Sequence, residues 1–273
     1  MTRRAFVMAL ALLTGTASHA ADMLEVRPGG VVRWPGDGSV TACQMAGERF
    51  EPVDGDCWFA IDLLTPEGGL DLGRVRDGVF ESTTVHVGSY PYPVQKLEVA
   101  PRHVDLSDAD AERSRLESER VATLWSLRTP RRFTLPLAPP LDPMPAARSF
   151  GNRRVFNGQP RGEHTGIDLS AATGTPVHAV ADGTVVLAAD HFFPGRAVYV
   201  DHGDGLVSMY FHLDTIAVAD GDEVARGELL GTVGATGRVT GAHLHFGLRW
   251  RGARIDPGPM LGDPDVVPRV SPN

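Results

Sequence analysis

The sequence contains almost no lysine and no cluster of basic residues. Only Lys96 is a lysine among the 26 basic residues, and the formal net charge of the chain is −8. An acidic chain without such a cluster is a poor candidate for nucleic-acid binding, because it cannot neutralise a phosphate backbone. The glycine-containing segment 221–231 also lacks the lysine that a biotinyl-type carrier domain would need. These absences argue against a nucleic-acid partner and against a carrier function.

Long apolar runs are missing beyond the first twenty residues, so we expect no membrane-spanning helix after them. Arg3 and Arg4 precede the apolar run 5–13, and Ser18-His19-Ala20 fits a small-x-small cleavage site. This pattern predicts a signal peptide over residues 1–20. Its removal takes away two arginines and changes the formal charge from −8 to −10. We therefore expect an exported protein, in the periplasm or, as an alternative, in the extracellular space.

Cysteine is scarce as well, because Cys43 and Cys57 are the only two. In an exported chain the expected state of such a pair is a disulfide, whose loop closure stabilises a fold by roughly 3 kcal/mol. A cysteine peptidase would need a partner histidine, and none lies between residues 20 and 85. We therefore expect a Cys43–Cys57 disulfide rather than a catalytic thiol.

Residues 21–105 are predicted to form a small N-terminal β-domain. Apolar runs at 31–32, 57–61 and 85–87 are typical of strands, and Pro/Gly/Asp turn signals separate them. This segment carries no evident catalytic set. Its function therefore stays open at this stage.

Residues 106–147 are predicted to form one connecting helix and a proline-rich linker. Ser107 with Asp110 resembles a helix N-cap, and the helix is expected to run to about Leu127. A partial apolar stripe along it comprises Leu116, Val121, Leu124 and Trp125. Six prolines between 130 and 145 exclude a continuous helix or a central strand there. The segment is either a linker or an extended arm, and through it the N-terminal domain could cover a cleft and keep an enzyme latent.

Residues 148–262 are predicted to form an antiparallel β-sheet domain, followed by a tail over 263–273. Glycine-containing turns separate its apolar runs, no helical run interrupts it up to about Met260, and a cleft is expected at the strand ends. The candidate strands are Thr175–Ala179, Gly183–Ala189, Ala197–Asp201, Val207–His212, Leu229–Val233 and His243–Trp250.

Histidines stand out in this domain. His243 and His245 alternate along the last candidate strand, so their side chains are expected on the same side, roughly 7 Å apart. His212 ends an apolar run, in which alternation predicts Tyr210 and His212 on one face. Each of these features alone is more typical of a structural histidine than of a catalytic one.

His164 and Asp168 lie four residues apart, as two ligands on one helical face would. The intervening Thr165-Gly166-Ile167 is a poor helix sequence, and a straight strand would separate the two Cβ atoms by about 13 Å, too far for one metal ion. We therefore expect a loop bent at Gly166 that feeds a strand at Ile167-Asp168-Leu169 and brings the two side chains together.

Five segments in this domain resemble the lysostaphin-type (LytM-like) zinc metallopeptidases over about residues 148–260. The segments are Gly162–Asp168, Ala179–Val185, Tyr210–Leu213, Gly231–Gly237 and Gly241–Phe246. The resemblance implies that His164, Asp168 and His245 bind one zinc ion per chain, and that His212 and His243 are the two non-ligand catalytic histidines. No expected position is missing, which matters because the family includes degenerate members that activate other hydrolases.

The resemblance implies an exported zinc metalloendopeptidase that hydrolyses peptide bonds in peptidoglycan stem peptides or crosslinks. Catalytic zinc polarises a scissile carbonyl and lowers the pKa of its water, while the two non-ligand histidines can act as base and oxyanion stabiliser, in an order left open. D-alanyl crosslinks and glycine bridges both remain candidate substrates. The alternative is a non-catalytic cell-wall-binding or amidase-activating protein on the same fold. The sequence does not specify an oligomeric state.

Overall fold

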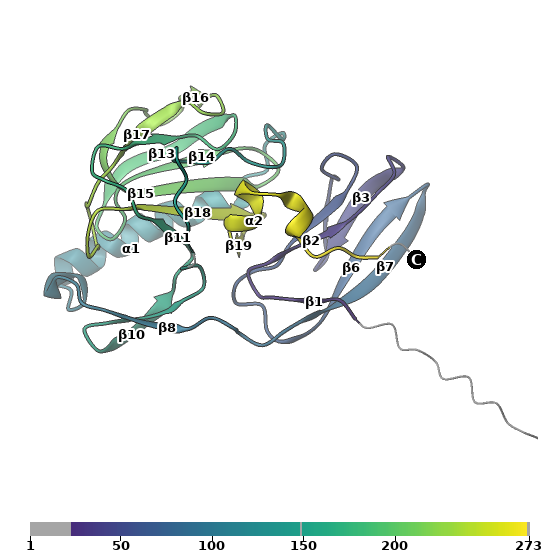
Figure 1. Cartoon of the computed structure of the whole chain (residues 1–273), viewed down its shortest axis with the longest axis horizontal. Coiled ribbons are helices and arrows are strands. Elements are labelled where there is room, and N and C mark those ends of the chain that lie inside the picture. Colours follow the sequence, from purple (N-terminus) through teal and green to yellow (C-terminus); the bar gives the residue numbers. More distant parts are fainter. Residues whose placement is uncertain (1–22, 148, 272–273) are drawn as a thin grey trace, which may run out of the picture.

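The chain is built mainly from antiparallel strands, which confirms the expected fold class. A computed structural model describes residues 23–147 and 149–271 (Figure 1). The predicted signal peptide over residues 1–20 lies outside the described residues. Within the described residues, no helix is both long enough and apolar enough to cross a membrane.

The N-terminal strands form a five-stranded sheet and a two-stranded ribbon around their own apolar cluster. The sheet has the order β1-β7-β6-β3-β4, and β2 pairs with β5. The bounds are β1 (Glu25–Val26), β2 (Val31–Trp34), β3 (Val40–Met45), β4 (Glu48–Phe50), β5 (Cys57–Ala60), β6 (Gly68–Arg76) and β7 (Val79–Val87). Cys43 and Cys57 form the expected disulfide inside this cluster.

A second, three-stranded sheet joins the two predicted domains. β8 (Val94–Leu97) lies parallel to β9 (Arg153–Phe156), and β10 (Gln159–Glu163) pairs with the other edge of β9 (Figure 1). β8 comes from the predicted N-terminal domain, but its partner strand comes from the predicted peptidase domain. The sequence did not indicate this pairing, which places N-terminal residues beside the C-terminal half of the chain.

The connecting helix begins where the sequence predicts. The short turn η1 (Pro101–His103) precedes α1 (Asp108–Ala122), and the turn η2 (Thr123–Ser126) follows it. Ser107 caps α1, because its side chain accepts a hydrogen bond from the backbone N–H of Asp110. The predicted stripe is only partly correct: Leu116 is 52% exposed, whereas Val121, Leu124 and Trp125 pack against the large sheet.

The C-terminal half forms a nine-stranded sheet. Its main order is β11-β18-β15-β14-β13-β16, with β12, β17 and β19 paired to this path. The bounds are β11 (Gly166–Leu169), β12 (Pro176–His178), β13 (Gly183–His191), β14 (Gly195–Asp201), β15 (Leu206–Ile216), β16 (Glu223–Val224), β17 (Leu229–Val233), β18 (Leu244–Trp250) and β19 (Ala253–Ile255). All six candidate strands are present, with ends shifted by up to four residues. The expectation of uninterrupted β-structure to Met260 is wrong, because α2 (Gly258–Leu261) forms a helical turn ahead of η3 (Pro264–Val266).

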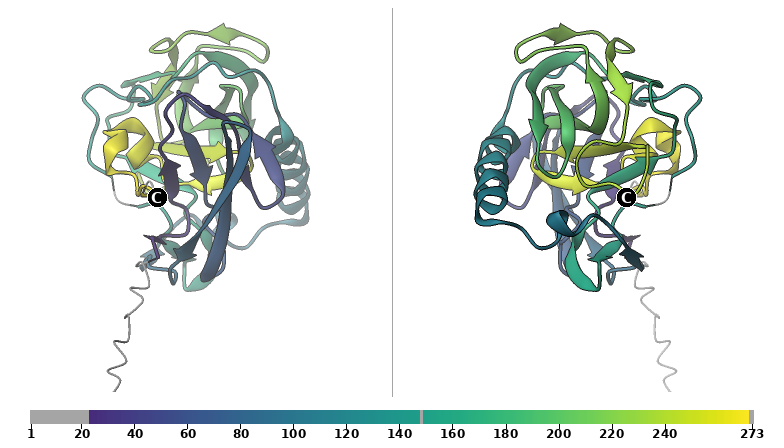
Figure 2. Two further views of the ribbon diagram at one scale, coloured as in Figure 1. Left: turned by 90° about the vertical axis from the view of Figure 1, so that its right-hand side faces the viewer. Right: turned by 90° about the vertical axis from the view of Figure 1, so that its left-hand side faces the viewer.

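One apolar core runs through all three predicted segments. Trp58 and Leu63 from the N-terminal strands are buried in the same cluster as Trp250 of β18. Phe133 from the proline-rich segment packs edge-on against Trp250, with ring centroids 5.6 Å apart. The proline-rich segment is therefore an arm packed on the sheet, whereas α1 flanks that sheet on another side (Figure 2).

Candidate metal centre

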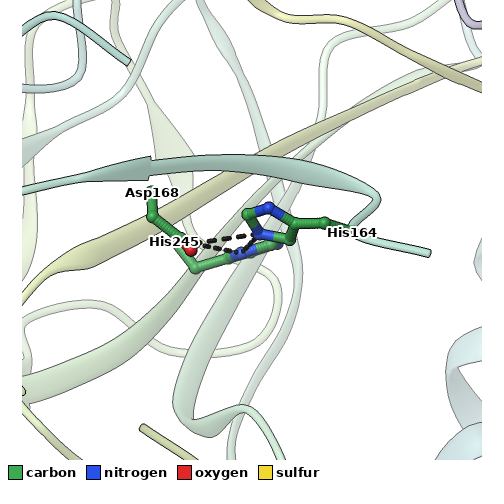
Figure 3. A group of neighbouring side chains, drawn as sticks. All are labelled: His164, Asp168 and His245. Carbon is green, nitrogen blue, oxygen red and sulfur yellow. Dashed lines mark hydrogen bonds and ion pairs between the residues drawn. The ribbon is translucent and has the colours of Figure 1, made fainter. Parts of the chain in front are cut away.

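His164, Asp168 and His245 point toward one another (Figure 3). Asp168 Oδ1 lies 2.9 Å from His245 Nδ1 and 3.0 Å from His164 Nε2. The two histidine nitrogens are 2.7 Å apart. The structure thus brings together the three side chains that the resemblance implies as ligands, and these are the one such group found among the described residues.

The chemistry of these three atoms fits a bound cation. His164 Nδ1 lies 2.8 Å from the carbonyl oxygen of Ser149. A carbonyl only accepts hydrogen bonds, so His164 carries its proton on Nδ1 and directs a lone pair from Nε2 at the other two groups. Electron-pair donors this close repel one another unless a proton or a metal ion lies between them. Two imidazoles and one carboxylate are a ligand set that zinc accepts, at distances of about 2 Å.

Strand pairing positions two of the three ligands. Asp168 on β11 and His245 on β18 are direct cross-strand partners in antiparallel register. Two positions before Asp168, Gly166 pairs with Gly247 of β18. A Cβ on Gly166 would lie 2.4 Å from the Phe246 carbonyl oxygen. The expected strand at Ile167-Asp168-Leu169 is present, but the bend is not at Gly166: β11 already begins there, and the glycine is required by the close approach of β18.

Two residues that the sequence did not single out hold Asp168 in place. The Ser149 hydroxyl accepts a hydrogen bond from the Asp168 backbone N–H at 2.8 Å. Arg154 donates to Asp168 Oδ2 at 2.8 Å, which leaves Oδ1 for the metal-facing side. Burial disfavours the charged carboxylate, but the adjacent imidazoles of His164 and His245 outweigh burial and hold the pKa of Asp168 well below its ordinary value. Asp168 is therefore ionised at neutral pH.

His243 reaches the same site from just outside the strand. The prediction that His243 lies in the last strand is wrong, because β18 begins at Leu244 and His243 makes only an isolated bridge to Gly234. Its Nδ1 lies 2.8 Å from the Gly241 carbonyl oxygen, so Nδ1 carries the proton. Its Nε2 lies 3.6 Å from Asp168 Oδ1. The other ring nitrogen, Nε2, therefore faces the ligand group.

His212 reaches the site through a β-bulge. Between Arg196 and Val198 of β14, the partner residues on β15 are Leu213 and Tyr210, so β15 holds one extra residue there. His212 has a φ of 66°, which is the left-handed conformation. The prediction that Tyr210 and His212 share a face is therefore wrong: Tyr210 lies in the main core, whereas the His212 ring lies 4.9 Å from that of His243.

His212 is kept neutral. Its Nδ1 lies 2.9 Å from the Thr236 carbonyl oxygen, so this nitrogen carries the proton. Burial, followed by the proximity of His245 and His243, lowers the pKa of His212 well below its ordinary value. His212 and His243 thus share one arrangement, in which a backbone carbonyl holds Nδ1 and Nε2 is the nitrogen left for the cleft.

The site lies in a cleft made of two adjacent hollows that share three lining residues. One, of about 220 Å³, contains Asp168, His212 and His243, and the other, of about 180 Å³, contains His164 and His245. Arg154, His212 and Arg238 line both hollows. Gln95, Leu97 and Val99, from β8 and the residues after it, line the first one. A cleft at this position agrees with the expectation from the sequence, but its wall includes N-terminal residues.

Comparison with known proteins places the sequence of this domain in a family. A model described as "Peptidase family M23" matches residues 162–257. A segment of 93 residues is 42% identical to the peptidoglycan DD-endopeptidase ShyA of Vibrio cholerae, over 34% of this chain and 22% of that protein. A segment of 94 residues is 44% identical to the DD-carboxypeptidase/endopeptidase Mpg of Neisseria meningitidis, again over 34% and 22%. The matched segments thus span about a fifth of these curated relatives.

The similarity to a solved structure covers most of the chain. A Pseudomonas aeruginosa protein assigned to peptidase M23 is 31% identical, over 86% of this chain and 94% of that one, with a TM-score of 0.66. This match includes the N-terminal strands as well as the large sheet, because it extends far beyond the 96 residues from 162 to 257. The chain therefore belongs to peptidase family M23.

Proposed function

We propose that this chain is an exported zinc metalloendopeptidase that hydrolyses peptide bonds in peptidoglycan stem peptides or crosslinks. The observation that carries the proposal is the convergence of His164 Nε2, Asp168 Oδ1 and His245 Nδ1 beside two further histidines. His164, Asp168 and His245 hold the zinc ion. When bound, zinc supplies a Lewis acid that polarises the scissile carbonyl and makes water a stronger nucleophile near neutral pH.

His212 and His243 act on the peptide group at their Nε2 atoms. A backbone carbonyl accepts a hydrogen bond from Nδ1 of each ring. Turning Nδ1 toward the cleft would break that bond, so Nε2 is the nitrogen that faces the substrate. A neutral imidazole accepts a proton from the attacking water and, as an imidazolium, passes that proton to the leaving amine, while a second ring stabilises the oxyanion by donating from a protonated Nε2. The pair supplies one group for each of these tasks.

The substrate class rests on the relatives and on the cleft. Two relatives that match the site-bearing segment are named as peptidoglycan DD-endopeptidase and DD-carboxypeptidase/endopeptidase. The two hollows beside the ligand group, of about 220 and 180 Å³, give a peptide access to it. Export, with the periplasm as its destination, is supported by the buried Cys43–Cys57 disulfide, because structural disulfides persist in oxidising compartments.

The proposal is tested by metal analysis together with digestion of purified sacculi. We expect one zinc ion per chain by elemental mass spectrometry, and muropeptides cut at a peptide bond. His245→Ala and chelation should each abolish both the zinc content and the hydrolysis, and added zinc should restore only the chelated wild type. Full hydrolysis by the His245→Ala variant would contradict the mechanism. Zinc binding without any hydrolysis would favour the non-catalytic wall-binding or amidase-activating alternative.

A further inference from the structure

Arg238 occupies a central position in the cleft. It lies in the segment between β17 and β18, and its backbone N–H donates to the Phe193 carbonyl oxygen at 2.9 Å. Its side chain lines both hollows, beside His212 and Arg154. Neither the ligand set nor the two non-ligand histidines account for this arginine.

Two aromatic rings hold the Arg238 guanidinium in one orientation. Its central carbon lies 4.2 Å from the Phe193 ring centroid and 4.5 Å from that of Phe156. Stacking of this kind fixes the plane of a guanidinium and leaves the N–H groups along its edge free to donate. The side chain is therefore oriented before any ligand binds.

Arg238 has no acidic partner among residues 23–147 and 149–271. No carboxylate oxygen of that part of the chain lies within 4.0 Å of its guanidinium, whereas Arg154 pairs with Asp168. Glu163 also lines the cleft but forms no ion pair with either arginine. Burial, and then the positive charges of Arg154 and Arg161, lower the pKa of Arg238 to about 10, so it remains charged at neutral pH.

We propose that Arg238 determines substrate specificity by binding a carboxylate of the peptide, close to the scissile bond. A planar guanidinium donates two parallel hydrogen bonds to a carboxylate, and such a pair is strongest where water is partly excluded. Because Arg238 lines the same two hollows as His212, this carboxylate belongs to a residue near the bond that is cut. This inference rests on the proposed function, since it specifies the class of peptide that the enzyme accepts.

The test compares crosslinked muropeptides before and after chemical amidation of their carboxylates. For the wild type we expect amidation to lower kcat/KM by about 10- to 100-fold, the effect of losing a charged hydrogen-bonded pair. Arg238→Gln should cleave both forms slowly, with less than a threefold difference between them. Arg238→Lys keeps the positive charge but cannot donate two parallel hydrogen bonds. It should retain part of the preference for the free carboxylate over the amidated form.

A binding measurement separates this inference from the proposed function. Calorimetry with uncrosslinked muropeptides, free or amidated, needs no hydrolysis. One outcome is that the wild type binds free muropeptides better than amidated ones, that Arg238→Gln abolishes this binding, and that no crosslinked form is cleaved. This outcome would support the inference and overturn the proposed function. Cleavage at equal rates of free and amidated substrates would overturn the inference and leave the function standing. Equal binding of free and amidated muropeptides by the wild type would also overturn the inference.

Two further variants control for the loss of any nearby arginine and for the loss of side-chain volume. Arg153→Gln removes a guanidinium that stacks on Tyr90 at 4.5 Å but lines neither hollow, and it should behave as the wild type. Arg238→Met keeps most of the side-chain volume between Phe156 and Phe193 but removes the guanidinium, so it separates loss of charge from loss of packing. If Arg238→Gln does not fold, the comparison of free and amidated substrates with the wild type and Arg238→Lys still tests the proposal. A preference for the free carboxylate that is unchanged in Arg238→Met would contradict it.

Discussion

Asp168 and His245 are direct partners across the β11–β18 ladder, and their facing atoms, Oδ1 and Nδ1, lie 2.9 Å apart. The backbone register of two strands therefore sets the spacing of two proposed ligands. A change that alters this register should therefore lower zinc affinity, because it displaces Asp168 relative to His245.

Gly166→Ala is expected to weaken the metal site and the fold together. The added Cβ would lie 2.4 Å from the Phe246 carbonyl oxygen and 2.7 Å from His245 Nε2, so β11 must move away from β18. Overpacking of this kind costs about 1–3 kcal/mol. Urea unfolding of the metal-free chain measures that loss, and zinc titration measures the loss of affinity.

Gly162→Ala is the matched control for this change. A Cβ at Gly162 meets no atom within 4 Å, and its φ is not in the left-handed region. We expect unchanged zinc affinity and unchanged unfolding. Equal behaviour of the two alanine variants would refute the role assigned to the close approach of the strands.

Arg154→Gln is expected to lower zinc affinity about 10- to 100-fold, the usual effect of removing a group that orients a metal ligand. Arg154 holds Asp168 Oδ2 at 2.8 Å, and without it the carboxylate can rotate away from the two histidines. Competition with a coloured chelator measures the affinity. An affinity equal to that of the wild type would show that Ser149 and the strand register suffice to orient Asp168.

The stability of the fold is expected to fall in mild acid because of His202. This residue is fully buried, with Nδ1 2.8 Å from the Asp182 carbonyl oxygen and Nε2 2.7 Å from the Ser208 hydroxyl. Burial lowers the pKa of His202 to about 4 from an ordinary 6.5. The unfolded chain therefore binds the proton first as the pH falls, so the stability is complete above pH 6.5 and declines between pH 6.5 and 4.

The comparison of His202→Asn with the wild type isolates this contribution. The loss in the wild type is on the order of 3 kcal/mol between these two pH values, from 1.36 kcal/mol per pKa unit. Urea unfolding of metal-free protein across this range should give a flatter profile for the variant. Parallel profiles would mean that His202 does not contribute to the pH dependence.

Removal of the N-terminal strands is expected to destabilise the enzyme rather than activate it. Trp58 and Leu63 are buried in the core that also contains Trp250, and β8 supplies part of the cleft wall. A chain beginning at Ala146 should therefore show a lower Tm and lower activity on sacculi than the chain beginning at Ala21. Higher activity of the shorter chain would instead support the latency hypothesis drawn from the domain order.

A milder variant tests the shared core without deleting any strand. Trp58→Ala should cost about 3–5 kcal/mol, because it removes a large buried ring. If this variant unfolds in the same single transition as the wild type, the N-terminal strands and the large sheet behave as one cooperative unit. A separate early transition would indicate two independent domains.

The sequence alone determined which residues could carry metal chemistry and where most of the sheet lies. Alternating apolar runs and glycine turns give strands through short-range geometry, so the six candidate strands from 175 to 250 are all present. Strands β3, β4 and β6 were missed, because polar residues and glycines interrupt their apolar pattern. His164, Asp168, His212, His243 and His245 could be selected because their residue types and motifs are local properties of the chain.

Only the tertiary structure decided how these residues meet and what surrounds them. The bulge that turns His212 into the site depends on the register of β15 against β14, which no local pattern encodes. The contacts of Arg154 with Asp168, and of Arg238 with two phenylalanine rings, join residues that are between 14 and 82 positions apart. Approach over such distances follows from the packing of whole strands, and it therefore becomes visible only once the sheet has formed.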